Sequence, residues 1–98
     1  MYQFQDTRYK VYRLTNHTLG EIYIGISRDT GYRIDQHAGV YAGGARTIEH
    51  WDWNSDDIAV YTYPLRFNSP FRASEYAHDS ERLCRLREGY QIFLTGGC

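Results

Sequence analysis

The sequence lacks long apolar runs and is poor in cysteine. No stretch approaches the roughly 18 apolar residues of a membrane span, and the polar residues 1–10 have no apolar core of a signal peptide. Its two cysteines, Cys84 and Cys98, are too few for a disulfide framework. We therefore expect an intracellular, cytoplasmic protein that has no membrane partner and is stabilised by its core.

The chain also lacks the basic excess that is typical of nucleic-acid-binding proteins. Its formal net charge is −1, so it has no global field for tight non-specific binding to phosphate. The two halves differ: residues 1–48 hold six Lys/Arg against four acids, a net of +2, and residues 49–98 hold five against eight, a net of −3. The first half can therefore present a local basic face.

What the sequence does contain is a set of short β-rich runs. Residues 9–14 and 21–26 mix aromatic and β-branched side chains with polar ones, and residues 15–20 between them have the composition of a turn. This order predicts an antiparallel hairpin. Residues 58–63 predict a third strand, which we expect Pro64 to end. Residues 90–94 could add an edge strand at the C-terminus.

Helices are expected around these strands. They are a helix through residues 32–37 capped by Ser27 or Asp29, a short one over residues 45–53, and a long one from Ser69-Pro70 to about Arg87. The length of 98 residues suits a single hydrophobic core. We predict one domain over residues 1–98, of the α/β (α+β) class, with a small three-stranded antiparallel sheet flanked by helices.

Two short motifs on the predicted hairpin carry a family resemblance. Lys10-Val11-Tyr12 and Tyr23-Ile24-Gly25 resemble the two motifs that name the GIY-YIG nuclease family, and their tyrosines are eleven positions apart. Arg33 lies ten residues beyond the second tyrosine, and His37 follows one helical turn later, as in that family. A Glu on the long last helix completes the pattern, and Glu75 is a better-placed candidate for it than Glu81.

The resemblance implies a metal-dependent endonuclease that hydrolyses DNA phosphodiester bonds. Glu75 would hold one Mg²⁺ or Mn²⁺ ion, and Arg33 would bind the scissile phosphate with its planar fork. Tyr12 would act as the base or orient the attacking water, with Tyr23 and His37 in the same pocket. A phenol with an ordinary pKa of ~10 would need neighbouring positive charge for that role.

Further residues are expected near the substrate. They are Lys10, Gly25, Arg28 and Gln91. Two of them depart from the family pattern, because Lys10 replaces a glycine and Gln91 replaces an asparagine. The expected partner is DNA, including branched or single-stranded regions, and a protein partner could supply the specificity that so short a chain lacks.

Other interpretations of the same residues remain open. The motif tyrosines could be ordinary half-buried sheet residues, and the same fold could serve as an inactive nucleic-acid-binding or protein-interaction module. Trp51 and Trp53 could stack on unpaired bases, although core packing is the commoner role. The remaining histidines and cysteines do not have the compact spacing of a zinc site.

Overall fold

A β-hairpin forms the centre of the computed structural model, which describes residues 9–94, with side chains described for residues 9–79 and 89–93. Strand β1 (Tyr9–Asn16) pairs antiparallel with β2 (Glu21–Ser27), with Tyr12 opposite Gly25. The connecting turn closes where the amide of Gly20, at φ 69°, donates to the Asn16 carbonyl. The predicted hairpin is confirmed.

The third strand is longer than predicted, because Pro64 does not end it. Strand β3 (Ile58–Phe67) pairs antiparallel with β1 and forms an edge of the sheet. Its register shifts between Lys10 and Tyr12, so residues 63–65 oppose a single residue of β1. An edge strand tolerates proline within such a bulge, since no second neighbour needs its missing N–H.

The sheet has four strands and is mixed, rather than three-stranded and antiparallel. Strand β4 (Gln91–Leu94) pairs parallel with β2, which gives the order β3-β1-β2-β4. The chain reaches this opposite edge through the long helix α2 (Pro70–Glu88), a crossover of the kind that parallel pairing requires. The strand predicted near residues 90–94 is therefore present, with a direction that the sequence did not reveal.

Helix ends follow local capping chemistry. The side chain of Asp29 accepts from the Tyr32 amide and begins α1 (Thr30–His37), and Ser69 likewise caps α2. The helix expected over residues 45–53 is only the short 3₁₀ turn η1 (Arg46–Ile48). Beyond it, the Asp52 carboxylate accepts from two backbone amides in a turn, which competes with helix continuation.

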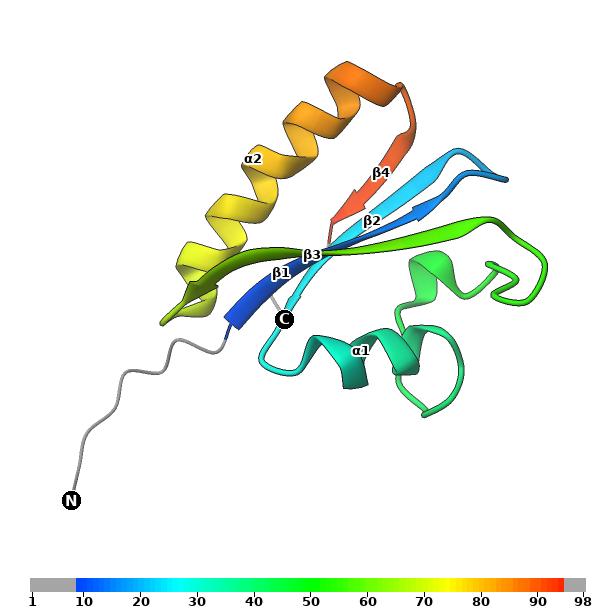
Figure 1. The fold of residues 1–98 in the computed structure, drawn as a ribbon, viewed down its shortest axis with the longest axis horizontal. Helices are drawn as coiled ribbons and strands as arrows, with labels where there is room; N and C mark the ends of the chain where they lie inside the picture. Colours follow the sequence, from blue (N-terminus) through cyan, green and yellow to red (C-terminus); the bar gives the residue numbers. More distant parts are fainter. Residues whose placement is uncertain (1–8, 95–98) are drawn as a thin grey trace.

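The two faces of the sheet are covered by different elements (Figure 1). Helix α2 packs Ala73 and Ala77 on one face, here called the α2 face, against Val11 of β1 and the isoleucines of β2. The other face, called the tyrosine face, carries Tyr12 and Tyr23 and is covered by α1, η1 and the segment that follows them. No helix in the described part of the chain is both long and apolar enough to cross a bilayer.

Candidate functional site

The two motif tyrosines lie side by side on the tyrosine face. Tyr12 and Tyr23 belong to neighbouring strands, and their ring centroids are 6.3 Å apart. Both are buried, with only 1% of Tyr12 exposed. Both are thus more buried than the half-buried sheet residues of the simpler interpretation, and they belong to the hydrophobic core of this face.

His37, at the C-terminal end of α1, forms a hydrogen bond with Tyr12 and packs against Tyr23. Its Nε2 lies 2.8 Å from the Tyr12 hydroxyl, and its ring meets that of Tyr23 edge-on at 4.9 Å. Its other nitrogen, Nδ1, accepts a hydrogen bond of 3.1 Å from the backbone amide of Ala45. Since that amide can only donate, Nδ1 carries no proton and Nε2 must be the protonated nitrogen of the neutral ring. His37 therefore donates to the Tyr12 oxygen.

The charge state of His37 agrees with this arrangement. Burial, and secondly the positive charge of Arg33, lower the pKa of His37 from its usual 6.5 to about 4. Protonation of Nδ1 would also turn the Ala45 amide from a partner into a clash. The imidazole is therefore neutral near pH 7, and its proton is aimed at Tyr12.

Gly25 makes room for Tyr12. A Cβ built at Gly25 would overlap the hydroxyl and the adjacent ring carbons of Tyr12, which lies directly opposite on β1. The space that a substrate was expected to use at Gly25 is thus filled by the tyrosine itself. Any larger side chain at this position displaces the Tyr12 ring from His37.

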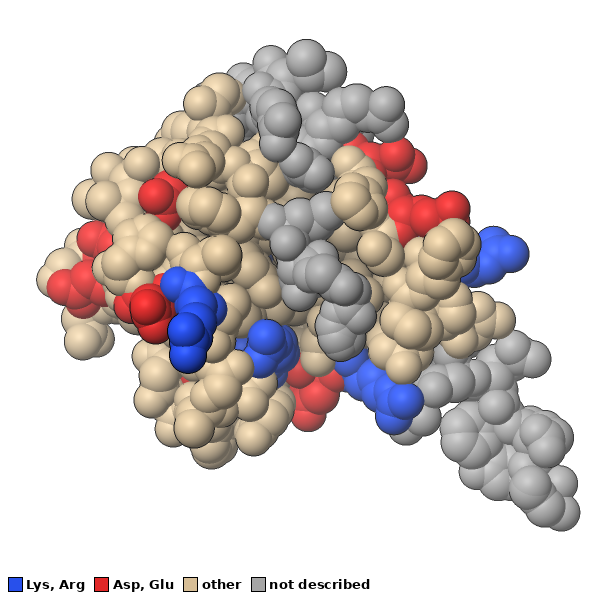
Figure 2. Space-filling model, turned by 180° about the vertical axis from the view of Figure 1, so that it is seen from behind, with Lys and Arg blue, Asp and Glu red and all other residues tan. Residues whose placement is uncertain are grey.

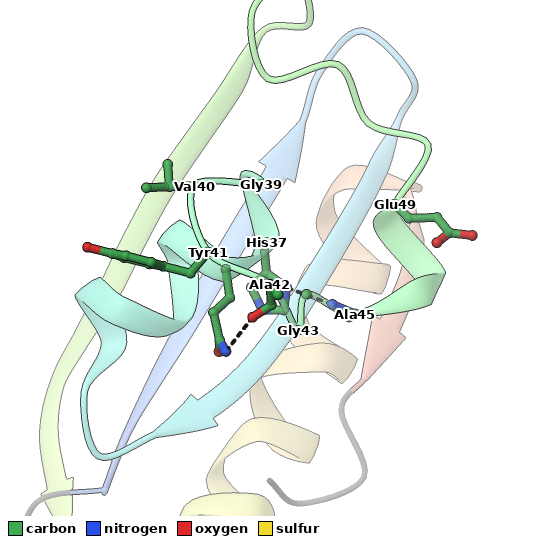
Figure 3. A pocket seen from close by; sticks show the side chains of 10 residues that line it. His37, Gly39, Val40, Tyr41, Ala42, Gly43, Ala45 and Glu49 are labelled. Carbon is green, nitrogen blue, oxygen red and sulfur yellow. Dashed lines mark hydrogen bonds between the residues drawn. The ribbon is translucent and has the colours of Figure 1, made fainter.

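Arg33 holds the segment that covers the site, residues 39–45, here called the glycine loop. Its Nη1 donates to the Gly43 carbonyl at 2.7 Å and to the Gln36 side chain at 2.9 Å, and Gln36 in turn donates to Ala42 at 2.9 Å. Together with the bond from Ala45 to His37, these contacts tether the C-terminal half of the loop to α1. The loop forms most of the wall of an open pocket of about 480 Å³ (Figure 3).

The pocket has one charged wall. His37 lies at its base, and Glu49 and Tyr41 lie on opposite sides of it (Figure 3). Glu49 was not among the residues singled out from the sequence. A carboxylate there disfavours a phosphate in the pocket itself and favours groups that donate hydrogen bonds.

Positive side chains gather at one end of the sheet. Lys10 and Arg66 are directly opposite one another on β1 and β3, and the alternation along β1 places Lys10 on the same face as Tyr12. Arg28 follows the end of β2 beside them, where it donates to the Tyr9 hydroxyl and stacks on that ring at 5.3 Å. Arg66 extends the predicted set, since no sequence motif marks it and only strand pairing brings it to Lys10.

The expected metal ligand, Glu75, does not lie near Tyr12, Tyr23 and His37. Glu75 is an exposed residue of α2, two positions from the buried Ala73 and Ala77 on either side, so it points away from the sheet. Helix α2 itself covers the α2 face, opposite the tyrosines. The side chain of Glu81, the alternative, lies outside the described residues.

Gln91 does not contact the tyrosine–histidine cluster, formed by Tyr12, Tyr23 and His37, and lies two positions before Phe93, the strand partner of Tyr23. It pairs with Glu21 at the end of the sheet opposite Lys10. No group of three His, Cys, Asp or Glu side chains suited to an ion occurs among the residues described. The residues around Tyr12 therefore do not fit an ion held by Glu75.

The two tryptophans belong to the core of the tyrosine face. Trp51 is buried, and its indole N–H donates to Glu21 at 2.7 Å, while Trp53 packs beside it with ring centroids 5.9 Å apart. His50 bonds to the same Glu21 carboxylate oxygen at 2.8 Å. The core role expected for at least one tryptophan is confirmed for Trp51.

Comparisons of the chain with protein-family models, with curated proteins and with solved structures gave no match. The candidate site is therefore defined by its own geometry.

Proposed function

We propose that this protein is an endonuclease that hydrolyses DNA phosphodiester bonds at the tyrosine–histidine cluster. The observation that carries the proposal is the 2.8 Å hydrogen bond between Tyr12 and His37, next to Arg33. Three residue types expected from the motif spacing thereby meet in one place. A proton acceptor, a group that orients it and a cation for phosphate are the parts that phosphodiester hydrolysis requires.

In this proposal Tyr12 acts in one of two ways: as a phenolate it takes the proton of the attacking water and becomes the phenol, or as a phenol it orients that water by a hydrogen bond. His37 donates through Nε2 to the Tyr12 oxygen, and a donor of this kind stabilises a phenolate more than a phenol. The Ala45 amide keeps His37 in the required tautomer, which makes Ala45 a positioning residue. Tyr23 packs against His37 and fixes the plane of its ring.

Arg33 would bind the phosphate after the glycine loop has moved. At 1% exposure Tyr12 cannot touch a substrate in this conformation, in which residues of α1, η1 and the glycine loop pack around it. The loop carbonyl of Gly43 accepts from Arg33, and a phosphate oxygen is a stronger acceptor for the same guanidinium because it is charged. Binding of phosphate to Arg33 and release of the loop are then one exchange.

None of these steps depends on the metal ion that the family resemblance implies. In the family pattern a divalent ion stabilises the developing negative charge on phosphate. Glu75 points away from the sheet, on a helix that covers the face opposite Tyr12, so it cannot hold an ion beside Tyr12 in this conformation. The cleavage assay therefore compares Mg²⁺, Mn²⁺ and a chelator.

A second function is favoured by the burial of Tyr12 and the position of Glu75. The same fold could bind nucleic acid without cutting it, with Lys10, Arg33 and Arg66 contacting the backbone. In that case the bond between Tyr12 and His37 only stabilises the packing of α1 on the sheet. The two functions differ in whether the hydroxyl of Tyr12 takes part in cleavage.

The test is the cleavage of plasmid and branched DNA by wild type and by Tyr12→Phe, each with Mg²⁺, with Mn²⁺ and with a chelator. Tyr12→Phe removes the hydroxyl and keeps the ring, so a nuclease should lose on the order of 10²-fold or more in rate. Tyr61→Phe is the matched control, because Tyr61 is an exposed residue of β3 outside the cluster. Circular dichroism establishes that both variants are folded.

The outcomes separate the two functions. Cleavage by wild type and Tyr61→Phe but not by Tyr12→Phe supports the nuclease. Equal cleavage by all three sinks the role of Tyr12. DNA binding that depends on salt concentration, without cleavage under any metal condition, supports the binding module instead.

A further inference from the structure

Two exposed tyrosines stack on one another beside the candidate site. Tyr32 of α1 and Tyr41 of the glycine loop have ring centroids 4.9 Å apart and an interplanar angle of 30°. About half of each residue is exposed, 49% of Tyr32 and 48% of Tyr41. The neighbouring Val40 is 64% exposed. These residues are exposed on the loop and α1, whereas the two motif tyrosines, Tyr12 and Tyr23, are buried.

This stack lies next to the arginine assigned to phosphate. Tyr32 precedes Arg33 on α1, and Arg33 bonds to Gly43, two residues beyond Tyr41. Tyr41 also lines the pocket above His37, and in Figure 3 it extends from the loop on the side away from Glu49. An aromatic surface and a guanidinium are thus held on the same short segment.

Positive side chains on the tyrosine face of the sheet favour a polyanion as the partner. Lys10 and Arg66 are paired across the strands on the same face of the sheet, although like charges directly opposite each other destabilise a strand pair. A bound phosphate chain would offset that repulsion. Acidic side chains are concentrated over the segment before β3, on the left of Figure 2, where they include Asp52, Asp56 and Asp57, and two more, Asp29 and Asp35, flank Tyr32 along α1.

We propose that Tyr32 and Tyr41, stacked as described, form a site for an unpaired base of single-stranded DNA, and that Arg33 takes the adjoining phosphate when Gly43 of the loop is released. The inference rests on the proposed function, because it names the form of DNA that the same face takes. Paired bases inside a duplex expose only their edges and cannot cover a ring, whereas an unpaired base presents its flat face. Stacking tolerates every base, so the site selects single-stranded or branched DNA without reading its sequence.

Glu49 gives the bound strand a direction. Its carboxylate repels a phosphate at the far side of the pocket, and Arg33 attracts one at the near side. The backbone of a strand that stacks on Tyr41 would therefore lie on the Arg33 side and away from Glu49. The scissile phosphate would lie next to the stacked nucleotide.

The test measures binding alone, in chelator, so that it does not depend on cleavage. Fluorescence anisotropy gives the affinity of wild type, Tyr41→Ala, Tyr32→Ala and Tyr41→Phe for a labelled single-stranded oligonucleotide and for the same oligonucleotide in a duplex. Tyr61→Ala is the matched control, because Tyr61 is 46% exposed and makes an edge contact with Tyr63 at 4.9 Å. Thermal unfolding establishes that each variant is folded.

Each alanine variant at the stack should weaken single-strand binding by about fivefold or more, since an aromatic ring contributes roughly that much or more per stacked base. Duplex binding should change by less than about twofold, and Tyr41→Phe should bind like wild type because it keeps the ring. The inference is overturned if wild type does not bind the single strand, if both forms of DNA lose affinity equally, or if Tyr61→Ala has the same effect. Single-strand binding without cleavage would refute the nuclease and leave the stacking site in place.

Discussion

Replacing His37 by glutamine should flatten the dependence of stability on pH. In the folded protein the pKa of His37 is about 4, against an ordinary value of 6.5 in the unfolded chain. The unfolded chain therefore binds a proton between these values that the folded protein does not, which favours unfolding as the pH falls. The stabilisation by neutral His37 is complete above pH 6.5 and is lost as the pH falls toward 4.

The size of the effect follows from the shift. A difference of about two and a half pKa units corresponds to about 3 kcal/mol of unfolding free energy lost across that window. Glutamine keeps an amide that can donate to Tyr12, and it does not titrate. Carboxylates that titrate in the same range are common to both proteins, so the difference between their pH profiles isolates His37.

The assay is urea unfolding of wild type and His37→Gln at several pH values between about 7 and 4. The wild type should lose about 3 kcal/mol more than the variant over this range, whatever the stability of each at pH 7. His50→Gln serves as the control, because His50 is an exposed residue that bonds to Glu21 and has no comparable burial. Parallel profiles for wild type and His37→Gln would refute the assignment of a neutral, buried imidazole.

Three further substitutions test the packing and the layer arrangement. Gly25→Ala should destabilise the protein by about 1–3 kcal/mol in urea unfolding, because its Cβ overlaps Tyr12, whereas Gly31→Ala, with no contact closer than 3.7 Å, should not; equal effects would contradict this. Asn16→Ala should cost about 1–3 kcal/mol in the same assay, since it strips buried partners from Asp56 and the Leu19 amide. Glu75→Ala should leave the cleavage rate within about twofold of wild type, and loss of cleavage would show that Glu75 reaches the site when substrate binds.

The hairpin and the capped helices could be predicted because their determinants are local. Alternating β-rich runs on either side of a turn specify β1 and β2 without reference to the rest of the chain. Asp29 and Ser69 each satisfy backbone amides within their own helix. The same locality explains why Tyr12 and Tyr23 could be placed together from their spacing.

The remaining features depend on contacts that spacing does not encode. The direction of β4 is set by where α2 delivers the chain, and Pro64 is tolerated because β3 is an edge strand. Arg66 reaches Lys10 only through a bulged register. The tautomer of His37 is fixed by the backbone amide of Ala45. This contact does not depend on the side chain at position 45, so the sequence could not predict it.

Glu75 is the residue that separates the resemblance from the proposed chemistry. Its distance along the sequence suited the family pattern, but the face of α2 on which it lies is fixed by Ala73 and Ala77, which pack on the sheet. A rotation of α2 that turned Glu75 inward would expose both alanines and would still leave it on the α2 face, opposite Tyr12. A carboxylate could join the tyrosine cluster more simply from the glycine-loop side, where Glu49 already lines the pocket with His37. The chemistry of this site therefore depends on the loop and α1, and much less on the long helix from which the metal ligand was expected.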